Sequence, residues 1–309
     1  MRHLLDVDDL SRAEMMDILA LAALTDPPPV LSGRGAALIF EKPSNRTRNA
    51  TEMAVFSLGG HPISIQGSEI GLGVREPVTD VVRVLALYHA VVGGRVNDHR
   101  LLEAMAAVDV VPVVNLLSDV AHPCQALADL VTLQQVWGSF EGRRVAWVGD
   151  GNNVARSLLL AAATVGTDVS VACPPGHELD PVAVDGARAQ GVDVCVTADP
   201  AEAVAGADAV CTDVWVSMGQ EAESAARLDA FAGYQVDDAL MGRAAPGAVF
   251  LHCLPAHRGL EVAASVIDGP ASVVWAQAAN RMHAVRGLLL WLVADAPATS
   301  DASAVSVRP

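Results

Sequence analysis

Short apolar runs alternate with helix-like stretches along almost the whole 309-residue chain. Strands that alternate with helices build parallel sheets, because a parallel connection needs a crossover long enough to hold a helix. The alternation therefore predicts an α/β fold. The predicted strands are residues 37–40, 62–65, 90–93 and 112–115 in the first half, and residues 144–148, 168–172, 193–196, 209–212 and 248–251 in the second half.

The length of the chain suits two domains of about 150 residues each. We expect two doubly wound parallel-sheet domains, formed by residues 1–135 and 136–276 and joined by a long helix at 122–138. A second apolar helix, at 277–294, is expected to pack back on the first domain. The tail at 295–309, rich in Ala, Ser and Asp, is expected to be disordered.

The charge of the chain excludes several classes of partner. Thirty-six acidic residues against 20 basic ones give a formal net charge of -16, which repels nucleic acid. The longest apolar stretches fall short of the ~20 residues that a transmembrane helix needs. Asp6, Asp8 and Asp9 stand where an export signal would carry basic residues, and the five cysteines never form a C-x-x-C pair. These features predict a reduced, cytoplasmic protein without membrane contacts.

A cluster of phosphate-binding groups follows the first predicted strand. Lys42, the only lysine, precedes Ser44, Asn45, Arg46, Thr47 and Arg48 at the point where an apolar run gives way to a helix-like pattern. Arginine offers a planar fork that matches phosphate, and the first turn of a helix offers free N–H groups and the positive end of its dipole. The alternative is an ordinary solvated basic turn. In so acidic a chain we favour a phosphate socket.

A glycine-rich turn at 149–151 resembles the start of a dinucleotide fold. The fingerprint is incomplete, because Val154-Ala155 replaces the third glycine and Ala172-Cys173-Pro174 stands where the ribose-binding acid is expected. NAD binding is therefore disfavoured. A strand end that presents Asn153 to a small ligand is the better interpretation, since ligands collect at the carboxyl ends of parallel strands.

Three further polar segments, at 122–125, 213–219 and 252–255, follow predicted strands and so lie at one edge of their sheets. Taken singly, a histidine there is a helix cap and a cysteine is a small buried apolar residue. The pairs His122/Cys124 and His252/Cys253 belong to different halves, whereas a zinc site needs three or four ligands at short spacing. We therefore expect no metal and no cofactor, and favour convergence of these segments on one small-molecule site.

Four motifs carry a family resemblance. They read FEKPSNRTR at 40–48, HPCQALAD at 122–129, DVWVSMG at 213–219 and HCLPAHRG at 252–259. In this order they resemble the ornithine carbamoyltransferases of the aspartate/ornithine carbamoyltransferase family, over residues 4–293. The first two motifs are shared with the aspartate branch, whereas the last two separate the ornithine branch from it.

The resemblance implies two substrate sites. The carbamoyl-phosphate site would consist of Ser44, Asn45, Arg46, Thr47, Arg48, Arg95, His122, Gln125, Cys253, Leu254 and Arg281. The ornithine site would consist of Asn153, Asp213, Ser217 and Met218. Arg95, His122, Cys253 and Arg281 would be the catalytic residues. The family also implies trimers, in which a neighbouring subunit supplies a glutamine near 66–71; Gln66 is the nearest candidate.

The implied reaction makes matching chemical demands. The neutral δ-amine of ornithine attacks the carbonyl carbon of carbamoyl phosphate, negative charge builds on the carbonyl oxygen, and phosphate departs to leave citrulline. Fixed donors around that oxygen are typically worth ~3 kcal/mol each. Cys253 lacks an adjacent His–Asp pair, so we interpret it as a hydrogen-bonding partner near the amine and not as a nucleophile.

The chain departs from the family pattern at Asn45, Pro77 and Ala279. These departures leave open a paralogue that uses a modified ornithine or another amine, or that runs catabolically. A more distant alternative is a non-catalytic relative that binds small ligands. The retained cations Arg46, Arg48 and Arg281 argue against that alternative, because a scaffold has no physical need for so many cations in one cleft.

Overall fold

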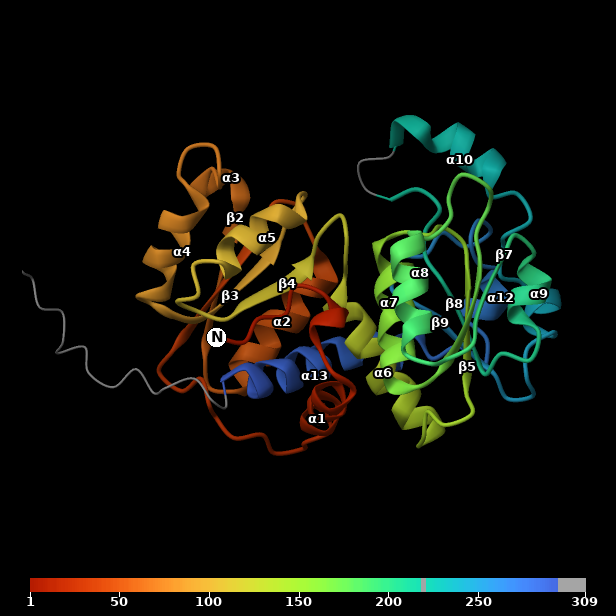
Figure 1. The fold of residues 1–309 in the computed structure, drawn as a ribbon, viewed down its shortest axis with the longest axis horizontal. Helices are drawn as coiled ribbons and strands as arrows, with labels where there is room; N and C mark the ends of the chain where they lie inside the picture. Colours follow the sequence, from red (N-terminus) through yellow and green to blue (C-terminus); the bar gives the residue numbers. More distant parts are fainter. Residues whose placement is uncertain (218–220, 294–309) are drawn as a thin grey trace, which may run out of the picture.

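The computed structural model describes residues 1–217 and 221–293, which form two α/β domains side by side (Figure 1). Met218, predicted to bind ornithine, and the tail 295–309, predicted to be disordered, lie outside these residues. The strands are β1 (Gly35–Phe40), β2 (His61–Gln66), β3 (His89–Arg95), β4 (Val113–Leu117), β5 (Arg144–Val148), β6 (Asp168–Ala172), β7 (Val194–Thr197), β8 (Ala209–Thr212) and β9 (Val249–His252). The helices are η1 (Val7–Asp9), α1 (Arg12–Ala22), α2 (Asn45–Ser57), α3 (Gly67–Ile70), α4 (Val78–Ala86), α5 (His99–Ala106), α6 (Pro123–Trp137), α7 (Asn153–Val165), α8 (Pro181–Ala189), α9 (Pro200–Val204), η2 (Glu221–Glu223), α10 (Ser224–Ala230), α11 (Asp238–Met241), α12 (Ala264–Ile267) and α13 (Val274–Val293).

Both sheets are fully parallel within the described residues, which confirms the predicted α/β class. The first has the order β2-β1-β3-β4 and the second the order β7-β6-β5-β8-β9. Each predicted strand falls on an observed one: β5, β6 and β8 have the predicted bounds, and the ends of the others are shifted by at most two residues. The largest consequence is in β3, which continues past residue 93 to Arg95 and so places that side chain at the carboxyl end of the sheet. There it pairs with Phe40, the last residue of β1.

The glycine pair at the end of β5 serves the chain's own packing. Gly149 has φ 137°, a conformation that only glycine adopts without strain. A Cβ atom on Gly151 would lie 2.5 Å from the backbone of Glu178 and Leu179. The close approach that a dinucleotide would need at this turn is thus made by the neighbouring loop, which accounts for the resemblance that the sequence showed.

Two long helices connect the domains. Helix α6 starts directly after His122 and ends at Trp137, where Gly138 caps it with φ 74°. Helix α13 begins three residues before the predicted start and packs against α6, α1 and α2 (Figure 1), as predicted for the last helix. The contact with α1 is close, because a Cβ atom on Gly287 would lie 2.5 Å from the carbonyl oxygen of Ile18.

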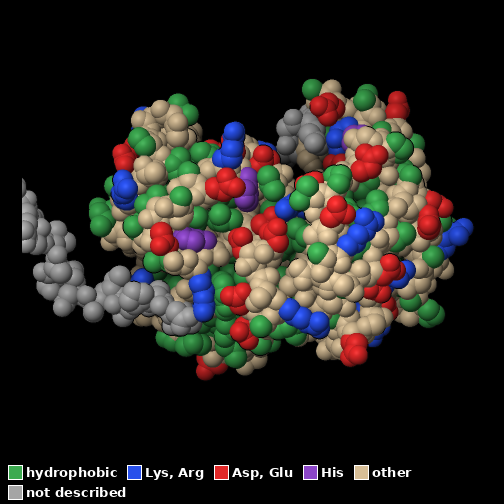
Figure 2. All heavy atoms as spheres, viewed as in Figure 1, with side chains coloured by type: hydrophobic (Ala, Val, Ile, Leu, Met, Phe, Trp, Pro, Cys, Tyr) green, Lys and Arg blue, Asp and Glu red, His purple; other side chains and the backbone are tan. Residues whose placement is uncertain are grey.

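The surface between the two domains is hollowed, and acidic and basic side chains are interspersed over the face drawn in Figure 2. None of the helices in residues 1–217 and 221–293 combines the length and apolar character needed to span a bilayer.

Candidate active site

The predicted phosphate socket is the start of helix α2. The Ser44 hydroxyl oxygen accepts a hydrogen bond from the backbone N–H of Thr47 at 3.2 Å and so caps the helix. The cap fixes the first turn, whose remaining N–H groups and dipole favour an anion. Thr47 is buried, and its hydroxyl accepts a hydrogen bond from Arg281 at 2.7 Å. Arg281 comes from α13, so the last helix completes the socket formed by the second one.

Three arginines gather at this socket. The Nε atoms of Arg46 and Arg95 are buried and have no hydrogen-bond partner among the described residues. Burial, followed by the charges of Arg281 and Arg46, lowers the pKa of Arg95 to about 10, whereas Cys253 acts in the opposite direction. Burial also lowers the pKa of Arg281. Cations that repel one another in a dry site are stabilised by a multiply charged anion such as phosphate.

His122 and Gln125 lie beside these cations at the start of α6. Burial, followed by the charges of Arg281, Arg95 and Arg46, holds the pKa of His122 well below its ordinary value, so its imidazole is neutral. Its backbone N–H donates to the Ser157 hydroxyl of α7 at 2.9 Å, which fixes the helix start. The His122 Nδ1 and Gln125 Oε1 atoms are buried without partners among the described residues. They are the groups left for a ligand.

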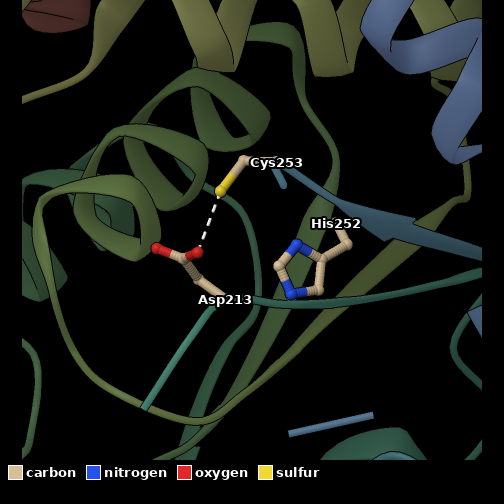
Figure 3. A group of neighbouring side chains, drawn as sticks. All are labelled: Asp213, His252 and Cys253. Atoms are coloured by element: carbon tan, nitrogen blue, oxygen red, sulfur yellow. Dashed lines mark hydrogen bonds between the residues drawn. The ribbon is translucent and has the colours of Figure 1, made fainter. Parts of the chain in front are cut away.

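The second sheet contributes an acid and a thiol from adjacent strands. Asp213 follows β8 and Cys253 follows β9, and the Cys253 Sγ atom donates to Asp213 Oδ1 at 2.9 Å (Figure 3). The other oxygen, Oδ2, accepts from the Asn152 side chain at 3.0 Å. Burial, followed by the charge of Asp213, raises the pKa of the Cys253 thiol well above its ordinary value. The thiol therefore stays protonated, which fits a hydrogen-bond donor and not a nucleophile.

His252 lies close to this pair, and ligand atoms of Asp213, His252 and Cys253 all fall within 4.8 Å of one another. Both nitrogens of its ring are nevertheless in use. Nδ1 accepts from the backbone N–H of Leu254 at 2.8 Å, so Nε2 carries the proton and donates to Glu261 at 3.2 Å. With the thiol protonated and bonded to Asp213, and with His252 bonded to other groups, the three side chains do not form a preformed metal site.

The remaining predicted residues are distributed unevenly. Asn153 donates from its amide to the carbonyl oxygen of Ser118 at 2.6 Å and thereby links the two domains. Ser217 is half-buried after β8, and Leu254 has φ 59°, a sparsely populated conformation that is frequent at binding sites. Asn45 and Arg48 are exposed instead. Asn45 accepts from Asn49, and Arg48 pairs with Glu52 at 2.9 Å, so neither joins the buried cations.

Three residues with clear roles were missed in the sequence. Asn152 caps α7 and also donates a hydrogen bond to Asp213. Its neighbour Asn153 is also an asparagine, so the residue type could not indicate which of the two reaches Asp213. Arg227 of α10 is buried, donates to the Trp215 carbonyl oxygen at 2.6 Å and pairs with Asp150, which ties α10 to the second sheet. Asp129 accepts hydrogen bonds from Gln125 and Gln277. It belongs to the HPCQALAD motif, and the signal in the sequence was an acidic side chain on a mostly apolar helix.

Comparisons with known proteins agree with this geometry. The model of the carbamoyl-P binding domain of aspartate/ornithine carbamoyltransferase matches residues 2–135, and the model of the Asp/Orn binding domain matches residues 141–292. An ornithine carbamoyltransferase from Methanothermobacter thermautotrophicus is 48% identical over 303 residues, covering 96% of this chain and 100% of that protein.

Solved structures are similarly close. The ornithine carbamoyltransferase from Pyrococcus furiosus superposes with a TM-score of 0.91 at 43% identity, covering 95% of this chain and 97% of that one. The anabolic ornithine carbamoyltransferase from Campylobacter jejuni superposes with a TM-score of 0.90 at 36% identity, covering 94% and 99%.

Proposed function

The chain belongs to the aspartate/ornithine carbamoyltransferase family, and we propose that it is the enzyme that transfers the carbamoyl group of carbamoyl phosphate to the δ-amine of L-ornithine. The products are L-citrulline and phosphate. The observation that carries the proposal is the meeting of two kinds of group at Arg95. Burial is the largest cause that lowers the pKa of Arg95, the charges of Arg281 and Arg46 from the first domain act in the same direction, and Cys253 from the second domain opposes them. Cations for phosphate and the acid–thiol pair for an amino acid thus share one site.

Carbamoyl phosphate binds first-domain groups in this proposal. Its phosphate lies at the start of α2, held by Ser44, Arg46 and Thr47, with Arg281 closing the socket from α13. Its carbonyl oxygen accepts from Arg95 and from neutral His122, which can donate without bringing a further charge. Asn45 and Arg48 contribute from the solvent side of the socket.

Ornithine binds between Asp213 and the polar groups around it. The Asp213 carboxylate pairs with the α-ammonium group of ornithine, and Asn153, Ser217 and Met218 hold the amino-acid end of the substrate. The neutral δ-amine attacks the carbonyl carbon, the bond from that carbon to the phosphate oxygen breaks, and the proton that the amine loses ends on the departing phosphate. Cys253 and Leu254 lie at the reacting groups, where the protonated thiol supports the developing charges.

The wider proposal follows from these assignments. Residues 1–135 with the helix 277–294 bind carbamoyl phosphate, and residues 136–276 bind ornithine. We propose a cytoplasmic homotrimer that acts in arginine biosynthesis and uses no cofactor. Its partners are its two small-molecule substrates and further copies of this chain.

One assay tests the proposal. Product formation from carbamoyl phosphate is measured with ornithine, N-acetylornithine, putrescine and aspartate offered separately. Ornithine should give a kcat/KM at least about a hundredfold above the others. Each of the other acceptors either lacks a polar group that the site binds or carries one for which the site has no partner, so a polar group is left unpaired in the complex. Preference for a modified ornithine or another amine would mark a paralogue, and absence of turnover with every acceptor would favour the non-catalytic alternative.

A further inference from the structure

A chain of hydrogen bonds runs from the second sheet to Gln125. The backbone N–H of His252 donates to Gln277 Oε1 at 2.9 Å. Gln277 Nε2 then donates to Asp129 Oδ1 at 2.7 Å, and Gln125 Nε2 donates to the same oxygen at 2.8 Å. All four residues are buried, with at most 3% of each exposed. The chain crosses from β9 through α13 to α6.

The direction of this chain is set at one end. A backbone N–H can only donate, so the Gln277 end that meets His252 is its oxygen and the end that meets Asp129 is its NH2 group. An ionised carboxylate can only accept, so Gln125 must also turn its NH2 group toward Asp129. Gln125 Oε1 is then the end that points away, and it is the atom left buried without a partner among the described residues.

Gln125 therefore presents an acceptor in surroundings made of donors. The unpartnered buried atoms at this site include the donors Arg46 Nε and Arg95 Nε, and His122, three residues before Gln125, directly precedes α6. An acyl phosphate offers acceptor oxygens to such donors whatever its acyl group. Only an acyl group with an NH2, such as carbamoyl, also offers a donor to Gln125 Oε1.

Resting on the proposed function, we propose that Asp129 is a positioning residue that fixes Gln125 with its oxygen toward the substrate and so makes the site selective for carbamoyl over acetyl-type groups. Without the acceptor at residue 129, the Gln125 amide is free to rotate by half a turn and present NH2 instead. Two donors would then meet, and the preference for a carbamoyl NH2 over a methyl group would be lost. Asp129 acts through Gln125 and does not touch the substrate.

The test uses two stable ligands that differ only at this position. Phosphonoacetamide carries the C(O)NH2 group, whereas acetonylphosphonate carries C(O)CH3. Their Kd values are measured by calorimetry at about pH 8.5, where Asp129 is ionised. Burial is the main cause that raises the pKa of Asp129, to about 7; the hydrogen bonds from Gln277 and Gln125 and the charge of Arg281 lower it, and the charge of Asp213 raises it. The wild type should bind the amide about tenfold more tightly, the value of one added hydrogen bond.

Asp129→Leu, which keeps the volume and removes the acceptor, should reduce this preference to about twofold or less. The matched control is Asn280→Leu, on the same pair of helices: the Asn280 side chain donates to Thr132 at 3.0 Å and to Gln135 at 2.8 Å, and within residues 1–217 and 221–293 no hydrogen bond joins it to Gln125. It should lower Tm and keep the tenfold preference. If Asp129→Leu does not fold, Asp129→Ala is used instead. A water that fills the space left by the shorter side chain can donate as well as accept, so it does not fix the orientation of the Gln125 amide.

A wild-type preference that persists in the Asp129 variant, or that is already absent in the wild type, overturns the inference. Failure of the wild type to bind either ligand would instead contradict the proposed function.

Discussion

At the carboxyl ends of their strands, the first sheet presents cations whereas the second presents an acid and a protonated thiol. Arg95 ends β3 and Arg46 lies in the first turn of α2, while Asp213 follows β8 and Cys253 follows β9. The formal charge of -16 would repel an anionic substrate, so its capture depends on the local cations of one domain. The same topology thus serves opposite charges through the few residues that end each strand.

The largest expected effect tests the cationic side. Arg46→Ala should lower kcat/KM for carbamoyl phosphate by about a thousandfold or more, since a charge-assisted contact to a dianion in a dry site is worth several kcal/mol. Steady-state kinetics with both substrates varied would show the loss. A change below about tenfold would mean that the phosphate does not bind at the start of α2.

Asp213→Asn tests the acidic side. Loss of the charge that pairs with the α-ammonium group should weaken ornithine by about 10- to 100-fold and leave the KM for carbamoyl phosphate nearly unchanged. The control is Asp208→Asn, just before the opposite end of β8, where the carboxylate pairs with Arg143 at 2.7 Å. Equal weakening of both substrates in the Asp213 variant would break the division of labour between the domains.

Asp129 lies between the two sides and should make stability depend on pH. Its pKa of about 7 lies above the value near 3.9 of an unfolded chain, so the folded state retains the proton longer. Its contribution to stability is full below about pH 4 and is lost as pH rises to about 7. Relative to wild type, Asp129→Asn should therefore gain on the order of 4 kcal/mol across this range. Urea unfolding at several pH values measures it; a pH-independent difference contradicts the assignment.

The smallest effect sharpens the boundary of the socket. Arg48 is exposed and already pairs with Glu52, whose carboxylate also accepts from the Ser64 hydroxyl at 2.5 Å. Arg48→Ala should lower kcat/KM less than about tenfold, because exposed ion pairs contribute little. A loss as large as that of Arg46→Ala would show that Arg48 turns inward when carbamoyl phosphate binds.

The positions of the strands along the chain and the edge of the sheets that carries the site were predictable from the sequence. Parallel strands bring their carboxyl ends together, so Asp213 and Cys253 could be placed at one edge before any distance was known. The orientation of side chains was not predictable in this way. Asn45 and Arg48 were predicted with Arg46, yet the helix turns them outward, since residues one and two positions away do not share a face.

Residues that act through others were the least predictable. Asn152 and Asn153 are identical in type, and only the geometry at the start of α7 directs one to Asp213 and the other to Ser118. Gln277 and Asp129 lie 148 positions apart, and no local pattern reports the hydrogen bond between them.

Helix α13 gives the order of synthesis a consequence for activity. The residues of the first sheet leave the ribosome early, yet the socket they form lacks Arg281 until α13, which follows the whole second sheet in the chain, has been translated and has packed beside α2. A nascent chain can therefore build the first sheet without yet holding the substrate phosphate in full. Such a chain would have little means of consuming carbamoyl phosphate before the proposed ornithine-binding domain, residues 136–276, has been made.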